Sequence, residues 1–185
     1  MVGLDTATPD PAELPEIIEV AVLLMDGPAV TRPPAVWWAR PSQPAGIAVP
    51  AGARPFVRLA HPWQAVAAEV TTELSDRTLV MHHPDRITLL RWHLPNYPPM
   101  DTISTRDLAR TTWPGLTDYN LGPLAVHARI NTIPHLPNDA TTEAHNIALL
   151  LLALLHHTTE RQNNPPAART LTRRPARVPA ASAGC

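Results

Sequence analysis

The sequence predicts an α/β domain built around one mixed sheet. Three observations predict this class: short apolar runs separated by turn residues open the chain, strands then alternate with helical patterns, and a long apolar helix follows. Hairpin strands followed by strand–helix units are typical of a sheet covered by helices. We therefore expect one domain over residues 1–161 and a disordered, Arg/Pro/Ala-rich basic tail over residues 162–185.

The first part of the chain predicts an antiparallel meander. Val2 to Thr6 forms a short buried strand that ends in the proline-rich stretch "ATPDPAELP", and Ile17 to Met25 forms a strongly apolar second strand. Asp26-Gly27 is a turn dipeptide that favours a hairpin, so Ala35 to Arg40 is the expected third strand. The segment from Pro41 to Pro62 is rich in proline, glycine and alanine, which predicts a surface loop.

The remainder alternates between short strands and helices. Brief strands are expected at 78–81 and 101–103, and helices at 63–74, from Pro84 onward, at 104–112 with Ser104 as N-cap, and at 120–129. Asn138 or Asp139 caps a last helix that runs to about Gln162 and is apolar nearly all round over 147–155. Trp63, Trp92 and Trp113 fall on apolar helical faces and are expected in the core.

Charge is distributed unevenly along the 185 residues. All 15 basic residues are arginines, and all 16 acidic residues lie at or before Glu160. With 11 arginines up to Arg161, the body carries a formal charge of −5, whereas the segment from Gln162 onward holds four arginines and no acid. A broad basic face for nucleic acid is therefore not evident on the body.

The remaining composition excludes some classes of site and location. Cys185 is the single cysteine, so no disulfide framework or cysteine-based zinc site is expected, and a reducing cytoplasm is the expected location. The adjacent histidines at 82–83 and 156–157 do not share a helix face, which argues against a zinc or di-iron site. The longest apolar run, 147–155, is too short to span a membrane, and no signal peptide is apparent.

Three segments, in this order, resemble the DnaQ-like 3′-5′ exonucleases of the DEDDh type, in the ribonuclease-H-like superfamily. They are "EIIEVAVLLMDG", "DTISTRDLARTTWPGLTDYNLGPLA" and "HLPNDATTEAHNIALLLLAL", and the resemblance covers about residues 2 to 160. It implies a ribonuclease-H-like mixed sheet flanked by helices. It also implies two-metal hydrolysis, with Mg²⁺ or Mn²⁺, at the 3′ ends of single-stranded DNA or RNA. Proofreading subunits of this family dock on a polymerase, so a polymerase or another protein is a further expected partner, and no membrane is.

The family's catalytic positions are only partly matched. Its first motif, Asp-x-Glu, places two carboxylates on one face of a strand; here Asp5 matches and Ala7 stands at the glutamate position. The second motif resembles His-Asn-x-x-Phe-Asp and is found at residues 82–87, where Ile87 replaces the terminal aspartate. His82, which opens this motif, is a candidate for contacting the nucleic acid.

The third motif is a histidine followed by an aspartate that leads the last helix. Asp139 matches the aspartate, and His135 lies four residues before it, where the family has five. The resemblance therefore implies that Asp5 and Asp139 hold metal and that His135 acts as the general base for the attacking water. Without a cation, two such carboxylates would repel each other, so one would titrate upward or an arginine or water would separate them.

Neighbouring acids could replace the missing ligands. Glu143 lies four residues after Asp139 on the same helix face and is the best candidate, although a solvated or ion-paired side chain is the simpler reading. Asp85 would point about 200° away from the expected position, and it suits a helix N-terminus without any metal. Glu13 and Glu16 are further candidates. On a strand, one of Trp37 and Trp38 faces outward, where it could stack on a base.

Three hypotheses for the function remain open. The first is an active 3′-5′ exonuclease whose missing ligands are supplied locally. The second is a non-catalytic descendant that binds single-stranded nucleic acid in the old cleft, and the third is a protein-interaction module. Because Ala7 and Ile87 replace two carboxylates, we expect exonuclease ancestry with activity weakened or lost.

Overall fold

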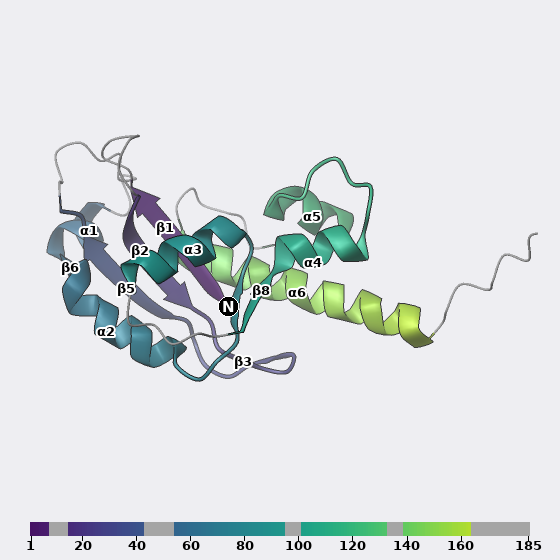
Figure 1. Ribbon diagram of the computed structural model, residues 1–185, viewed down its shortest axis with the longest axis horizontal. Helices are drawn as coiled ribbons and strands as arrows, with labels where there is room; N and C mark the ends of the chain where they lie inside the picture. The colour runs from purple at the N-terminus through teal and green to yellow at the C-terminus, as the bar shows by residue number, and fades with distance from the viewer. Residues whose placement is uncertain (8–14, 43–53, 95–100, 133–138, 164–185) are drawn as a thin grey trace, which may run out of the picture.

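The computed structural model describes residues 1–7, 15–42, 54–94, 101–132 and 139–163 (Figure 1). Its strands are β1 (Val2–Ala7), β2 (Glu16–Val22), β3 (Met25–Asp26), β4 (Ala29–Val30), β5 (Ala35–Arg40), β6 (His61–Pro62), β7 (Leu79–Met81) and β8 (Thr102–Ser104). Its helices are α1 (Arg54–Leu59), α2 (Trp63–Leu74), α3 (Pro84–His93), α4 (Thr105–Thr112), α5 (Leu121–His127) and α6 (Ala140–Asn163). The chain is thus a mixed α/β domain, as expected.

The main sheet has the strand order β1-β2-β5-β6. The first three strands are antiparallel and form the expected meander, while β6 pairs with β5 in parallel. The expected turn carries a short hairpin, in which β3 pairs with β4 and Gly27 has a φ of 53° that favours glycine. The parallel strands β7 and β8 form a separate ladder, and β7 contacts β1.

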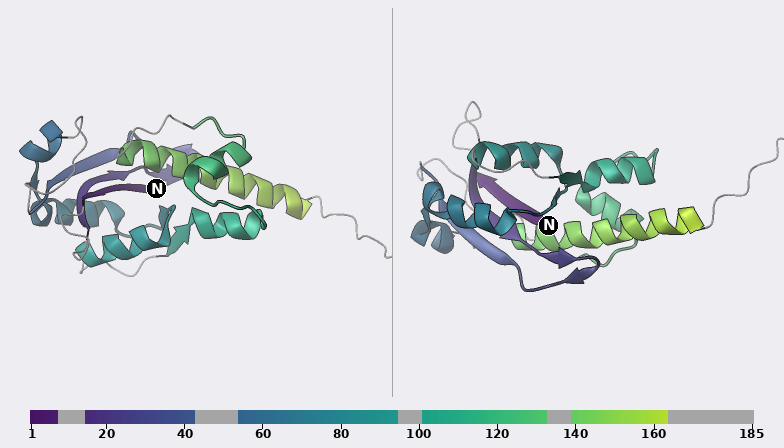
Figure 2. Two further views of the ribbon diagram at one scale, coloured as in Figure 1. Left: turned by 90° about the horizontal axis from the view of Figure 1, so that it is seen from above. Right: turned by 60° about the horizontal axis from the view of Figure 1, so that its bottom comes forward.

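Helices cover both faces of the main sheet (Figure 2). On one face, Val20 and Val22 of β2 pack with residues of α2 and α3, including Val70 and Leu90. On the other face, Ala21 and Leu23 pack against three alanines of α6, which are Ala140, Ala144 and Ala148. Because alanine side chains are small, the axis of α6 lies close to the sheet.

The second half of α6 extends beyond the sheet, and α4 and α5 pack on it there (Figure 1). A helix of 24 residues is about 36 Å long, which is longer than the strands it covers. Leu150 and Leu154 of α6 form a separate buried cluster with Ala109 of α4 and Leu124 of α5. The helix was predicted to be apolar nearly all round. It packs against the sheet at one end and against α4 and α5 at the other.

The structure corrects two of the expectations for local structure. The segment expected to be a loop up to Pro62 contains α1 and β6, because Val57 is buried and residues 61–62 pair with β5. Trp92 is not in the core, since 58% of its surface is exposed. Residues 43–53 and 164–185, which include nearly all of the expected tail, lie outside the described part. Within the described part, no helix is both long and apolar enough to cross a membrane.

Candidate functional site

The start of α6 lies directly against β1. Of the two residues expected to cap this helix, Asn138 and Asp139, Asp139 makes the capping bond: its Oδ1 accepts a hydrogen bond from the Thr142 backbone N–H at 3.0 Å. A Cβ atom placed on Gly3 would lie 1.9 Å from the carbonyl oxygen of Ala140, so only glycine allows this approach. The contact brings Asp139 beside the strand that carries Asp5, whose side chain lies outside the described part of the structure.

Glu19 is a buried acid that the sequence analysis missed. It is the register partner of Asp5 on the neighbouring strand β2, and only 3% of its surface is exposed. Its Oε2 accepts a hydrogen bond from the Ala140 backbone N–H at 3.2 Å, so the carboxylate satisfies a free donor at the positive end of α6. The signal was available in "IIEVAV", where a single acid interrupts an apolar strand.

Glu143 and Arg86 both bind the peptide backbone of Leu4, the residue before Asp5. The Glu143 Oε2 accepts from the Leu4 N–H at 3.0 Å, and the Arg86 Nη1 donates to the Leu4 carbonyl at 2.8 Å. Side chains from α6 and α3 thus satisfy backbone groups of β1 that a neighbouring strand would otherwise pair. Glu143 is therefore engaged in holding the fold, and a guanidinium charge lies beside the backbone next to Asp5.

Ile87 lies in the core rather than at the surface of a site. Only 8% of its surface is exposed, and it belongs to the same apolar cluster as Leu4 and Leu90. The position at which the resemblance calls for a third carboxylate is therefore apolar. Asp85 is exposed in the first turn of α3, where a carboxylate suits the helix dipole.

The described side chains do not fit a two-metal centre. The described carboxylates at the start of α6 bind backbone N–H groups: Glu19 binds Ala140, Asp139 binds Thr142, and Glu143 binds Leu4. Among the residues that the structure describes, no three His, Cys, Asp or Glu side chains are grouped so that they could hold a metal ion. His135 lies outside the described residues, so its expected role stays a prediction.

The prediction that His82 contacts nucleic acid is wrong. Its side chain is 1% exposed, and its ring nitrogens are hydrogen-bonded to the Thr105 hydroxyl at 3.0 Å and to the Tyr119 carbonyl at 3.1 Å. Burial, with a smaller contribution from His83, lowers the pKa of His82 to about 4, so it is a neutral residue that joins β7 to α4 and the segment before α5. The residue that lies toward the surface is His83.

An aromatic pair lies on the same face of the sheet as Glu19. Trp38 of β5 is the register partner of Glu19, and partners on antiparallel strands point to the same face. Its ring stacks on Phe56 of α1 with centroids 5.2 Å apart and planes 19° from parallel, and Phe56 is 57% exposed. Its neighbour Trp37 points to the other face, where it packs against the core and donates to Glu69 at 3.0 Å.

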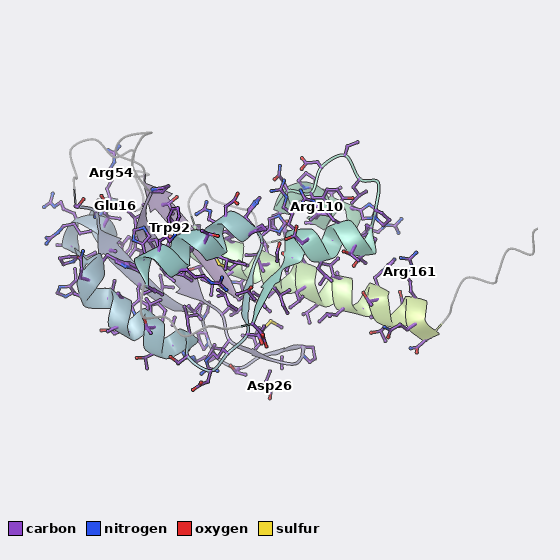
Figure 3. The ribbon with its side chains drawn as sticks, viewed as in Figure 1. Glu16, Asp26, Arg54, Trp92, Arg110 and Arg161 are labelled. Atoms are coloured by element: carbon purple, nitrogen blue, oxygen red, sulfur yellow. The ribbon has the colours of Figure 1, made fainter. Side chains whose placement is uncertain are left out.

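A groove of about 420 Å³ runs along α3. It is lined by Thr6 and Pro15 beside the sheet and by Asp85, Arg86, Thr88, Leu89 and Trp92 of the helix. Figure 3 shows Trp92 at the same end of the molecule as Glu16 and Arg54. The groove therefore extends from the Arg86 guanidinium to an exposed indole ring.

This arrangement of sheet and helices is the fold of the DEDDh 3′-exonucleases. Exonuclease X in complex with 5′ overhanging duplex DNA matches over 85% of this chain and 92% of its own, with a TM-score of 0.62 and 22% identity. The nuclease domain of 3′hExo, a DEDDh family member bound to rAMP, matches over 84% and 90%, with a TM-score of 0.67 and 14% identity.

A third similar structure concerns 3′-end specific recognition of histone mRNA stem-loop by 3′-exonuclease. It matches over 84% of this chain and 80% of its own, with a TM-score of 0.66 and 17% identity. No protein-family model matches the sequence, and the comparison with curated proteins finds no match. The likeness therefore establishes the fold.

Proposed function

We propose that the chain binds single-stranded nucleic acid at the start of α6 and that its metal-dependent hydrolysis is weak or absent. The observation that carries the loss of hydrolysis is the position of Ile87. Its side chain packs in the core where a nuclease of this fold would need a carboxylate. Ala7 removes a second carboxylate at the sequence level. Each loss of about 1.4 kcal/mol of transition-state stabilisation slows a reaction about tenfold, so two missing ligands leave little activity.

The solved structures of the same fold support nucleic acid as the ligand. They are described with duplex DNA, with rAMP and with an mRNA stem-loop, although each shares less than a quarter of its residues with this chain. The stacked pair of Trp38 and Phe56 supports the same class of ligand, because base–aromatic stacking contributes about 1–3 kcal/mol per base. Trp38 lies two β-strands from Asp5, about 10 Å away. One single-stranded nucleic acid could therefore contact both places.

The test has a binding arm and a hydrolysis arm. We expect the protein to bind short single-stranded DNA or RNA with an affinity that falls as salt rises, and Phe56→Ala to weaken this binding about fivefold or more. We expect no more than trace release of nucleotides from 3′-labelled strands with Mg²⁺ or Mn²⁺. Metal-dependent release that Asp5→Ala abolishes would disprove the loss of activity and favour the first hypothesis, an active exonuclease.

A second outcome of the binding arm separates the remaining hypotheses. If single strands do not bind even at low salt, the nucleic-acid proposal is wrong and the protein-interaction hypothesis takes its place. The double change Ala7→Glu with Ile87→Asp tests the alignment of the motifs. A gain of metal-dependent hydrolysis would support that alignment, and no gain in a folded double variant would count against it.

A further inference from the structure

Two arginines and a histidine lie where α3 and α4 begin. Arg106 of α4 donates from its Nη1 to the His83 Nδ1 at 3.2 Å, while Arg86 of α3 reaches the Leu4 carbonyl. Arg86 is joined to His83 through the backbone, since the Arg86 N–H donates to the His83 carbonyl oxygen at 3.1 Å. Burial, followed by the charges of Arg106 and Arg86, lowers the pKa of His83. We call His83, Arg86 and Arg106 the arginine cluster.

The two arginines have hydrogen-bonding capacity that the protein does not use. In the described part of the structure, neither has an ion pair with a carboxylate, and the Arg106 Nε is buried without a hydrogen-bond partner. A buried polar atom without a partner is costly and needs an explanation. Each guanidinium has five N–H donors, and each of these two makes one described side-chain hydrogen bond, so most donors remain available.

The ligand that such donors suit best is a phosphate. Arginine binds phosphate through two parallel N–H···O bonds, and these charge-assisted bonds are about twice as strong as neutral ones. The groove along α3 starts at Arg86 and adds the hydroxyl of Thr88 and the exposed ring of Trp92, so it can hold the nucleotide attached to that phosphate. Asp85 is the one acid among the lining residues, and its exposed position lets it turn toward water.

We propose that the arginine cluster binds a backbone phosphate of single-stranded nucleic acid without any divalent cation. In the position before Ile87, the motif of the resembling exonucleases has phenylalanine, whereas this chain has Arg86. The chain has thus lost carboxylates that would need a cation and has a fixed cation of its own. This inference rests on the proposed function, because the cluster lies beside the start of α6: Arg86 and Glu143 of α6 bind the same residue, Leu4.

The test is a binding titration of a fluorescein-labelled oligothymidylate in the presence of EDTA. The wild-type protein is expected to bind equally well with EDTA and with Mg²⁺. Arg86→Gln and Arg106→Gln are each expected to weaken binding about tenfold, and each should reduce the slope of log affinity against log salt by about 0.7. Arg91→Gln is the matched control, because it removes the same charge from an exposed position on α3 and should change affinity less than about twofold.

Two further measurements separate the possible failures. Arg86→Lys keeps the charge and a donor for Leu4 but loses the forked geometry, so it should bind with intermediate affinity even if the glutamine variant unfolds. Binding that requires Mg²⁺ would disprove phosphate binding by the arginine cluster. A folded Arg106→Gln variant that binds like wild type would disprove it as well. If the oligonucleotide does not bind at all, the proposed function is wrong, and ³¹P NMR of inorganic phosphate then tests phosphate binding by the arginine cluster separately. Phosphate bound by wild type but not by the arginine variants would support the cluster as a phosphate site. No binding of phosphate to the wild type would disprove it.

Discussion

Replacing Gly3 by alanine should destabilise the domain strongly. The new Cβ would lie 1.9 Å from the Ala140 carbonyl oxygen and 2.8 Å from its carbon, while real Cβ atoms rarely come closer than 3.0 Å. Because the opposing atoms are backbone, α6 must shift by about 1 Å. Over-packing of this kind costs about 3 kcal/mol, the upper end of the usual range. For a domain of this size, that corresponds to a fall in Tm of about 6–12 °C.

The matched control for this change is Gly122→Ala in α5. No atom lies within 4 Å of a Cβ added there, and alanine favours a helix over glycine by about 0.5–1 kcal/mol, so its Tm should stay equal or rise slightly. Thermal unfolding followed by circular dichroism measures both variants. If Gly3→Ala unfolds within about 2 °C of wild type, the close packing of α6 on β1 is wrong, and with it the nearness of Asp139 to Asp5.

Three further predictions concern Ile87, Glu143 and His82. Ile87→Asp should cost about 3–5 kcal/mol in urea unfolding because it removes a core side chain and buries a carboxylate, whereas Ile87→Val should cost about 1 kcal/mol; equal small losses would contradict the burial of this residue. Glu143→Ala leaves the Leu4 N–H without its partner and should lower the free energy of unfolding by about 1–2 kcal/mol. Glu143→Gln keeps an acceptor and should lower it by less than half of that, and identical losses would show that this hydrogen bond does not stabilise the fold. His82 has a folded pKa of about 4 against 6.5 in the unfolded chain, so the unfolded state binds the extra proton between these values and stability falls by up to about 3 kcal/mol as the pH drops from 6.5 to 4. The pH dependence of Tm should weaken in His82→Gln, and an unchanged profile would show that another group is responsible.

Most of the fold could be predicted because its signals are local. The apolar run of β2, the helical spacing over residues 63–74 and the caps at Ser104 and Asp139 all depend on near neighbours in the chain. The helix α1 was not predicted because it has only 6 residues, of which one, Val57, is buried, and it lies in a proline-rich segment. Periodicity needs a longer stretch than this to be visible.

The site was harder to predict because its contacts are remote in the sequence. Glu19 binds Ala140 across 121 positions, and Arg86 reaches Leu4 across 82. Trp92 was expected in the core because spacing shows which side chains share a helix face but not whether another element covers that face. His82 was expected at a binding surface for a similar reason, since its hydrogen bonds to Thr105 and Tyr119 come from later segments. In each case the role of the residue depends on contacts with segments that are distant in the sequence.

Hydrogen exchange of the Leu4 amide, which donates to Glu143, can report on the contact between α6 and β1. Because that amide is held by a side chain of α6 rather than by a neighbouring strand, its proton exchanges with solvent only when the start of the helix moves away from β1. The exchange rate at this one position therefore measures how often the site opens. It can be followed in the free protein, and a ligand that fixes α6 against the sheet will slow it.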